Sequence, residues 1–397
     1  MSRKRSVVDA DLDGRRVLVR VDFNVPVKDG VVTDDTRIRA SVPTIELVLE
    51  RGGRVILLSH LGRPAGIGYE EPFSTKPCAD RLSQLIDAPV RYVRDVCGKE
   101  AREAADELEP GQVLMLENLR FDPREKKNDP EFAAELAAMG DVYVDDAFGV
   151  SHRAHASVVG VPRLLPSYAG LLMAKEVETI TGMLEDPARP FVAVLGGSKV
   201  SDKIGVIDNL MTKADTILIG GGMCFTFLKA QGHGVGTSLL ENDWVQRAAE
   251  MLDKAAGCGC RLVLPVDYVV ADRFAPDART EVVAADAIPA DMMGLDVGPR
   301  TVGAYAEAIA GARSVFWNGP MGVFEMPAFE AGTRGVAQAI ADNEEAESIV
   351  GGGDSGAAVN QFGLADRMTF VSTGGGASMK LVEGESLPGV EAIPDAR

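Results

Sequence analysis

Short apolar runs recur along the whole chain and are separated by longer polar or mixed stretches. In the first half the runs lie at residues 17–21, 55–58, 113–116 and 142–144, and in the second half at 191–195, 216–219, 261–264, 314–317, 348–350 and 369–371. Runs of this length are typical of strands buried on both faces of a parallel sheet. Two intervening segments, 129–139 and 243–256, place apolar residues three and four apart, as amphipathic helices do. The alternation predicts an α/β fold with parallel sheets that helices cover on both faces.

The length of the chain, 397 residues, indicates two domains, because one hydrophobic core rarely grows beyond roughly 250–300 residues. Between the two series of runs, residues 162–167 contain two prolines, and a helical pattern then continues until it ends near Pro187. We interpret this region as a linker followed by a connecting helix.

Composition narrows the class of protein. Hydrophobic residues make up 46% and charged residues 25% of the chain, which is ordinary for a globular protein. Apolar runs stay far below the roughly 20 residues that span a bilayer, and the basic N-terminus lacks the apolar core of a signal peptide. We therefore expect a cytoplasmic protein with no membrane partner. The net charge of −18 argues against nonspecific nucleic-acid binding, so an acidic substrate would need a local basic pocket.

The five cysteines are odd in number and scattered, at Cys78, Cys97, Cys224, Cys258 and Cys260. We therefore expect reduced thiols rather than a framework of disulfides. The Cys258-Gly259-Cys260 triplet resembles half of a zinc site, but no second cysteine pair or histidine cluster supplies the remaining ligands.

The loops that follow the runs of the first half are rich in groups that bind anions. In parallel sheets ligands bind beyond the carboxyl ends of the strands, so these loops are where chemistry is expected. They and their neighbours carry Asp22, Asn24, Arg37, His60, Arg63, Arg120 and Arg153. The planar guanidinium of arginine matches phosphate and carboxylate groups. If the loops converge, four arginines and a histidine line a pocket for a small, strongly anionic molecule.

Each of these residues also has an ordinary structural explanation. A single arginine is usually a solvated surface charge, and Asp22 and Asn24 could equally cap a turn. His60 could act as a general base, a structural residue or a substrate contact, and we favour the contact. We expect His155 to be structural.

The loops of the second half are rich in glycine, at 196–197, 220–222, 319–322, 351–353 and 374–376. Glycine lets a backbone approach a ligand closely, and the N-terminus of a following helix offers free N–H groups to phosphate. One triple glycine could be only a tight turn, but three of them favour a nucleotide site. If a helix begins near them, Lys199 and Lys203 lie on one face of it and could neutralise phosphates. Asp354 could bind magnesium or cap a helix. The P-loop and protein-kinase motifs are absent from the sequence.

Taken in order, the motifs DFNVP, SHLGRP, ENLRF, HRAH, GGSKVSDKI, GGGM, FTFLKA, WNGPMGVFE, GGGDS and STGGGAS resemble those of the phosphoglycerate kinases. The resemblance runs from about residue 17 to residue 389. It implies two doubly wound parallel-sheet domains joined by a hinge helix. The first, residues 1–165 with a returning tail at 380–397, would bind 3-phosphoglycerate. The hinge helix would span 166–185, and residues 186–379 would bind the nucleotide.

Residue by residue, the resemblance assigns the acid substrate to Asp22, Asn24, Arg37, His60, Arg63, Arg120 and Arg153. It assigns the nucleotide to Lys199, Lys203, Gly298, Asn318, Glu325, Gly352, Gly353, Asp354 and Ser355. Arg37 and Lys199 would stabilise the transferring phosphoryl group, to which Gly374, Gly375 and Gly376 would offer backbone N–H groups. Asp354 would hold Mg²⁺. Ser355 stands where family members commonly have threonine, and the loop contacts between Arg120 and Pro130 differ because this chain is short there.

The implied reaction is a reversible, Mg²⁺-dependent transfer of phosphate between ATP and the carboxylate of 3-phosphoglycerate, giving ADP and 1,3-bisphosphoglycerate, in glycolysis and gluconeogenesis. A carboxylate is ionised at neutral pH and needs no general base, so positioning and charge neutralisation suffice. Hinge closure would precede chemistry. The alternatives are a kinase or ligase acting on another acid and a noncatalytic binding protein. We expect a monomer with small-molecule substrates and no nucleic-acid partner.

Overall fold

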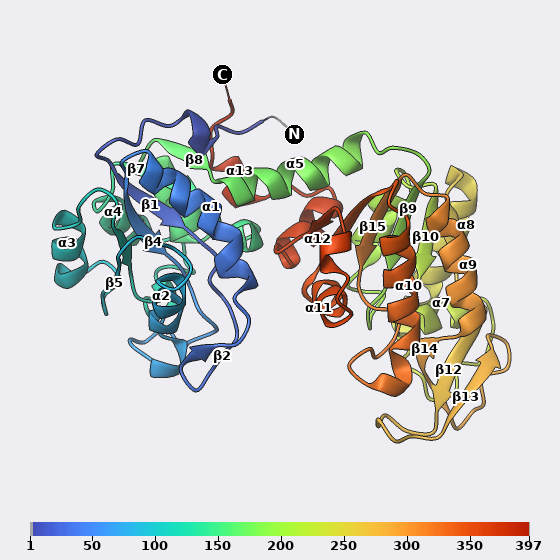
Figure 1. The fold of residues 1–397 in the computed structure, drawn as a ribbon. Coiled ribbons are helices and arrows are strands. Elements are labelled where there is room, and N and C mark those ends of the chain that lie inside the picture. The colour runs from blue at the N-terminus through green and yellow to red at the C-terminus, as the bar shows by residue number, and fades with distance from the viewer. Residues whose placement is uncertain (1–2, 397) are drawn as a thin grey trace. The chain divides into compact units, whose positions relative to one another are not determined.

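The computed structural model describes residues 3–396 and divides into two compact units. The first unit runs to Glu178 and includes the C-terminal segment from Ser386 onward, and the second spans Thr179–Glu385. Each unit is built around its own six-stranded sheet, with helices packed beside it (Figure 1). Helix α5 (Leu171–Glu185) contains the boundary between the units.

The sheet of the first unit is parallel throughout. Its strand order is β5-β6-β4-β1-β7-β8. The strands are β1 (Arg16–Arg20), β4 (Arg54–Leu58), β5 (Val90–Tyr92), β6 (Val113–Met115), β7 (Val142–Asp145) and β8 (Ser167–Ala169). Val17 and Val19 pack in one apolar cluster with residues of α1 (Thr36–Glu50) and α2 (Lys76–Leu82). Leu18, between them, points to the opposite face and is equally buried. Both faces of the sheet are therefore covered.

Smaller elements complete the first unit. They are the hairpin of β2 (Val27–Lys28) and β3 (Val31–Val32), the helices α3 (Lys99–Asp106), α4 (Pro130–Ala137) and α13 (Pro388–Glu391), and a single π-helical turn at Ala156–Gly160. Helix α4 begins where Asp129 accepts hydrogen bonds from the backbone N–H groups of Glu131 and Phe132. The C-terminal segment is tied to this unit by the Gly389 N–H, which donates to the Ser151 carbonyl.

The second unit repeats the parallel design with the strand order β11-β10-β9-β15-β16-β17. These strands are β9 (Phe191–Leu195), β10 (Thr216–Ile219), β11 (Arg261–Val263), β15 (Ser314–Asn318), β16 (Glu347–Gly351) and β17 (Phe370–Val371). The helices are α6 (Ile204–Leu210), α7 (Cys224–Ala230), α8 (Val245–Cys258), α9 (Pro299–Ala310), α10 (Ala331–Asp342), α11 (Gly353–Gln361) and α12 (Gly376–Val382). An antiparallel sheet adds β12 (Asp267–Ala271), β13 (Thr280–Ala284) and β14 (Met293–Val297).

The predicted fold class, α/β with two doubly wound parallel-sheet units, is confirmed. All ten apolar runs form strands of the two parallel sheets. The region interpreted as a linker and connecting helix contains a 3₁₀ turn at Val161–Arg163, the edge strand β8, which the sequence did not predict, and then helix α5. The edge strands β5 and β8 were missed because each has only three residues, too few to form a clear apolar run. Within residues 3–396, none of the helices has both the length and the apolar character that crossing a bilayer would require.

Candidate active site

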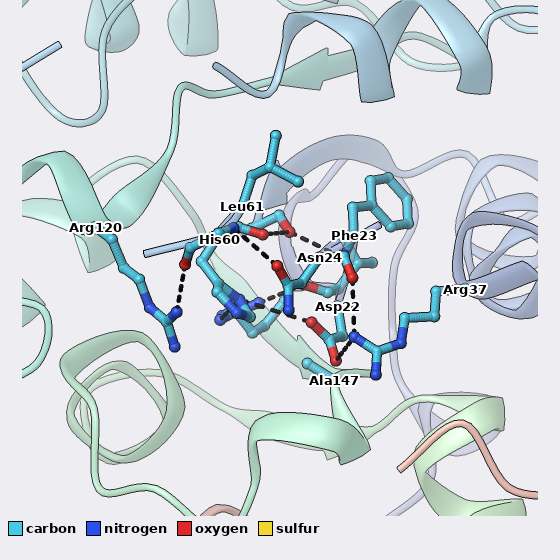
Figure 2. A network of polar contacts seen from close by, with 12 residues as sticks. Asp22, Phe23, Asn24, Arg37, His60, Leu61, Arg120 and Ala147 are labelled. Carbon is cyan, nitrogen blue, oxygen red and sulfur yellow. Dashed lines mark hydrogen bonds and ion pairs between the residues drawn. The ribbon is translucent and has the colours of Figure 1, made fainter. Parts of the chain in front are cut away.

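The candidate acid-binding residues of the first unit gather at one edge of its sheet. Strands β1, β4, β6 and β7 are parallel, so the loops that follow them begin at the same edge. Figure 2 shows Asp22 and Asn24 from the loop after β1, His60 from the loop after β4 and Arg120 from the loop after β6 lying close together, with Arg37 of α1 reaching in from the side. The predicted convergence of these loops is present in the structure.

Asp22 and Asn24 connect Arg37 to the loop after β4. Arg37 Nη1 lies 3.3 Å from Asp22 Oδ2 and donates a 3.0 Å hydrogen bond to the Asn24 carbonyl. The side chain of Asn24 accepts a 2.8 Å bond from the Gly62 N–H. Asp22 is 8% exposed. These two residues therefore do more than cap a turn, because they fix the guanidinium of Arg37 relative to the neighbouring loop.

Arg20, at the last position of β1, is fully buried behind this pocket. Its Nε donates 2.9 Å to the Ser157 hydroxyl, Nη1 donates to the Val21 carbonyl, and Nη2 lies 3.3 Å from His60 Nδ1. Because a guanidinium can only donate, Nδ1 of His60 accepts and the ring proton sits on Nε2. Burial first, and then the charges of Arg20 and Arg120, hold the pKa of His60 well below its ordinary value. His60 is therefore a neutral imidazole at neutral pH, and it can contact a ligand only as an uncharged hydrogen-bonding group.

Glu125 is linked to Arg20 through the Ser157 hydroxyl rather than by direct contact. It is fully buried, and it accepts hydrogen bonds from the Ser157 N–H (2.9 Å) and from the Ser157 hydroxyl (2.6 Å), the same hydroxyl that accepts from Arg20. Burial raises the pKa of Glu125, and the charge of Arg20 opposes that rise. Arg20, Ser157 and Glu125 form a charged layer beneath the pocket, and this layer joins β1 to the π-helical turn.

Arg120 is positioned by the two residues that precede Leu119 on the same loop. Asn118 accepts from the Arg120 N–H at 3.0 Å and donates to the carbonyls of Leu61 (2.7 Å) and Phe73 (2.8 Å). Glu117 accepts from the Asn118 N–H at 2.7 Å. Arg120 Nη1 donates 2.7 Å to the Gly62 carbonyl, which leaves a buried Nε with no hydrogen-bond partner in the structure. Burial, with the charges of Arg20 and Arg153, lowers the pKa of Arg120 to about 10. A positive group so placed favours an anion.

Arg63 and Arg153 are both exposed, unlike Arg120. Arg153 Nε donates 3.1 Å to His152 Nε2. His155 is buried, and burial followed by the charges of Arg120 and Arg20 lowers its pKa to about 3. A neutral, buried imidazole agrees with the structural role expected for His155.

In the second unit, backbone groups build the corresponding sheet edge. The loops after β9, β10 and β15 are joined by hydrogen bonds from the Gly196 N–H to the Asn318 carbonyl (2.9 Å) and from the Gly221 N–H to the Met321 carbonyl (3.0 Å). A Cβ atom at Gly196 would lie 2.0 Å from the Pro320 carbonyl oxygen. These glycines are required because the loops pack backbone against backbone.

Asn318 links the loop after β15 to the loop after β16. Lys203 Nζ donates to Asn318 Oδ1, and Asn318 Nδ2 donates 2.7 Å to the Gly351 carbonyl. Gly352 has φ 91°, and a Cβ there would lie 2.5 Å from Asn318 Nδ2. Burial lowers the pKa of Lys203, while the carboxylates of Asp202 and Asp354 act in the opposite direction. Lys203 and Asp354 therefore attract each other electrostatically at this edge of the sheet.

Two of the predicted nucleotide residues, Ser355 and Gly298, and one residue predicted to contact the transferring phosphoryl group, Gly374, make structural contacts in this unit. The buried Ser355 hydroxyl accepts a 2.6 Å bond from the Gly319 N–H. Gly298 is the N-cap of α9, where a Cβ would lie 2.3 Å from Asp267 Cγ. The N–H of Gly374 donates 3.1 Å to the Ser372 hydroxyl, so that group is already used within the chain.

The remaining predicted residues of the second unit are more accessible. Lys199, Glu325, Gly353, Asp354 and Gly376 are exposed, and Gly375 is half-buried with φ 51°. Gly353 and Asp354 open helix α11, and Gly376 opens α12 directly after Gly375. Free N–H groups at these two helix starts suit phosphate oxygens.

The surroundings of Asp354 fit a magnesium ion that is also bound by the phosphates of a nucleotide. Across residues 3–396, no three side chains of the His, Cys, Asp or Glu type group together as metal ligands would. Magnesium commonly takes one or two carboxylates and completes its shell with phosphate oxygens and water. An exposed carboxylate at a helix start meets that requirement.

Comparison with known proteins agrees with this geometry. A family model described as phosphoglycerate kinase matches residues 7–385. The phosphoglycerate kinase of Herpetosiphon aurantiacus is 54% identical over 393 residues, which cover 99% of both chains. That of Rubrobacter xylanophilus is 56% identical over 395 residues, covering 99% of this chain and 98% of its own. The chain belongs to the phosphoglycerate kinase family. The structure of phosphoglycerate kinase from Coxiella burnetii matches with a TM-score of 0.88 at 43% identity over 98% of each chain.

As a phosphoglycerate kinase family member, the chain contains polar residues near its acid pocket that sequence reasoning missed. Arg20 lies within the apolar run 17–21 and was therefore not singled out, although a charged residue near the end of such a run indicates a buried polar contact. Glu125 lies in the strongly charged stretch 122–129, where nothing marks it as buried. Asn118 belongs to the ENLRF motif, which by itself assigns it no role. The three make long-range hydrogen bonds to other segments of the chain, which no local pattern reveals.

Proposed function

We propose that the chain catalyses the reversible transfer of a phosphoryl group between ATP and the carboxylate of 3-phosphoglycerate, giving ADP and 1,3-bisphosphoglycerate, as a cytoplasmic step of glycolysis and gluconeogenesis. The observation that carries the proposal is the convergence of Arg37, His60 and Arg120 on one sheet edge in a member of this family. The buried, unpartnered Nε of Arg120 supports it, since an unmet donor in a basic pocket favours an anionic ligand.

On the acid side, the proposal gives each group a role that follows from its contacts. Arg120, Arg63 and Arg153 would bind the phosphate and carboxylate groups of the acid. Neutral His60 would donate from Nε2 to a substrate oxygen. Asp22 and Asn24 would hold Arg37 and the loop after β4 in position. From there they would contact the hydroxyl or the carboxylate of the substrate.

On the nucleotide side, the phosphates would lie at the starts of α11 and α12, where Gly352, Gly353, Gly375 and Gly376 leave room for them. Lys199 and Lys203 would neutralise phosphate charge, and Glu325 and Asn318 would complete the nucleotide contacts. Asp354 would hold Mg²⁺, which supplies further charge neutralisation when it is bound.

The proposed chemistry requires no proton transfer to a base. The attacking carboxylate is ionised at neutral pH, which agrees with a pocket whose histidine is neutral and serves as a donor. Arg37 and Lys199 would stabilise the charge on the transferring group. Because each half-site belongs to its own unit, we include in the proposal a closure motion that brings the two substrates together and excludes water.

The test is a steady-state assay in which ADP formation is coupled to a detectable signal, with MgATP and a panel of acids at low and high salt. We expect turnover with 3-phosphoglycerate to exceed that with acetate, glycerate or aspartate by at least about a hundredfold, because only the phosphorylated acid engages all the arginines. Equal turnover of acetate and 3-phosphoglycerate would contradict the assignment and favour a kinase for another acid.

A further inference from the structure

The Cys258-Gly259-Cys260 triplet joins the end of helix α8 to strand β11 and has no part in the proposed kinase chemistry. Its two thiols differ in accessibility, because Cys258 is exposed whereas Cys260 is only 5% exposed. The other three cysteines of the chain, Cys78, Cys97 and Cys224, are all buried. The triplet therefore combines one thiol that solvent reaches with a second thiol two positions away.

The backbone of the triplet brings the two cysteines within bonding range. Gly259 follows the last residue of α8 and has φ 78° and ψ 7°, a left-handed conformation that turns the chain about as tightly as a helical residue does. Two Cα–Cα steps of about 3.8 Å that meet in such a turn place the Cα atoms of Cys258 and Cys260 about 5.5 Å apart. Disulfides ordinarily join Cα atoms about 4.4–6.8 Å apart. The required backbone separation is already present.

The glycine also leaves the turn free on its outer side, because a Cβ built at Gly259 would have no heavy atom within 4 Å. The Cys258 thiol donates to the carbonyls of Met211 (3.3 Å) and Ala255 (3.5 Å). Thiols are weak donors, so little holds the Cys258 side chain in this position. Because these bonds are weak, the Cys258 side chain can turn toward Cys260.

The surroundings favour thiol chemistry over metal binding. In the described part of the chain, no third His, Cys, Asp or Glu joins the two cysteines in a group that could hold a metal ion, whereas zinc needs about four ligands. Burial, with the negative charges of Cys258 and Asp215, raises the pKa of the Cys260 thiol to about 11. The exposed Cys258 is therefore the thiol that meets a reagent first.

We propose that Cys258 and Cys260 form a dithiol that exchanges with low-molecular-weight disulfides such as oxidised glutathione and closes to an intramolecular disulfide. In the first step the Cys258 thiolate attacks one sulfur of the reagent, whose S–S bond breaks and releases one glutathione thiolate. In the second step the Cys260 thiolate attacks the Cys258 sulfur and expels the second glutathione. Two electrons pass from the dithiol to the reagent, and the two protons pass through solvent to the released thiols.

The mechanism makes the two cysteines unequal. Cys258→Ser removes the accessible nucleophile, so the buried Cys260 that remains should react at least about tenfold more slowly than the native pair. Cys260→Ser keeps the first step and blocks the second, so one glutathione stays attached to Cys258. In the native chain the second step becomes about tenfold faster for each pH unit between about pH 7 and 9, because the thiolate fraction of Cys260 rises in that proportion.

The experiment treats the folded full chain and both serine variants with oxidised glutathione, quenches with acid, and counts free thiols by alkylation and mass spectrometry. We expect the native chain to lose two of its five thiols without retaining glutathione, to carry the new bond in the peptide that contains both cysteines, and to recover both thiols with dithiothreitol. A lasting glutathione adduct on Cys258 of the native chain would overturn the proposal, as would five unreacted thiols or disulfide-linked dimers.

Discussion

The candidate half-sites of the two units are built by different means. In the first unit the candidate groups are side chains, and buried side chains lie behind them, such as Arg20, whose Nη2 lies 3.3 Å from His60 Nδ1. In the second unit the pocket is made largely of backbone, and its loops pack so closely that a Cβ at Gly196 or Gly352 would collide. The first unit must therefore stabilise buried charge, whereas the second must exclude side-chain volume.

This difference predicts that different substitutions disable each half. Neutralising a buried charge should damage the first unit, because the partner charge is then left without compensation in a medium that solvates it poorly. Adding a single methyl group should damage the second unit, because at Gly196 it meets backbone atoms that cannot move aside, and at Gly352 it meets the Asn318 side chain, which is bonded to Lys203 and Gly351.

The largest effect is expected for Arg20→Met. This change removes a buried guanidinium that bonds to Ser157 and lies beside His60, and whose charge favours the ionised form of Glu125, so it should lower the free energy of unfolding by about 3–5 kcal/mol. Arg16→Met on the same strand is the matched control, because Arg16 is partly exposed and pairs with Asp106 and Asp141 near the surface. Calorimetry of both variants and of Arg20→Met/Glu125→Gln measures the difference. Equal losses from the two single variants, or no recovery in the double variant, would contradict a buried pair.

The next effect concerns catalysis in the first unit. Arg37→Ala should lower turnover by about a hundredfold or more while the KM for ATP stays within about twofold, because only the transferring group loses a contact. Arg39→Ala, two positions along α1, is the control, since Arg39 is exposed and pairs with Asp35. Steady-state kinetics with 3-phosphoglycerate and MgATP give both constants. Unchanged turnover in Arg37→Ala would remove this residue from the catalytic groups.

In the second unit, Gly352→Ala should raise the KM for ATP about tenfold, because the new methyl group displaces the Asn318 side chain that Lys203 contacts. The KM for 3-phosphoglycerate should stay constant. Gly363→Ala is the control, because Gly363 also has a positive φ but no atom lies within 4 Å of its Cβ position. It therefore shows the effect of backbone strain without a steric clash. That variant should lose only about 1 kcal/mol of stability. If both variants bind ATP equally well, close packing at Gly352 is not needed for the nucleotide.

The sequence was sufficient for those parts of the molecule that local patterns encode. Strands buried in parallel sheets are apolar runs, and the rule that ligands lie beyond their carboxyl ends was enough to locate Asp22, His60 and Arg120. The layer behind the pocket was not predictable in this way. Arg20 meets Ser157 across 137 positions of sequence, and such contacts depend on which loops the sheet order brings together. For the same reason, the packing of Gly298 against Asp267 could not be predicted from the sequence around Gly298.

The last effect is a change of stability with pH, and it concerns Asp146, a buried carboxyl group of the first unit. Its Oδ1 accepts hydrogen bonds from the N–H groups of Leu172 (2.9 Å) and Met173 (3.3 Å) at the start of α5. Burial raises the pKa of Asp146 to about 8, against opposing hydrogen bonds from Thr44 and these two N–H groups. The folded protein therefore keeps a proton that the unfolded chain, with an ordinary value near 3.8, has released. The stability that this proton contributes is complete below about pH 4 and is lost as the pH rises toward about 8.

Asp146→Asn keeps the oxygen acceptor for α5 and removes the ionisation. Relative to this variant, the native protein should lose up to about 1.4 kcal/mol of stability for each pH unit between about pH 6 and 8, and the difference should level off above that range. Asp141→Asn is the control with the opposite sign. Although burial acts to raise it, hydrogen bonds from Arg16 hold the pKa of Asp141 below its ordinary value, so its contribution changes only in acid. Calorimetry from pH 6 to 9 should show a slope for Asp146→Asn and a constant offset for Asp141→Asn. Parallel profiles for both variants would mean that Asp146 is ionised in the folded protein, and that the first unit stabilises this charge by hydrogen bonds rather than by retaining a proton.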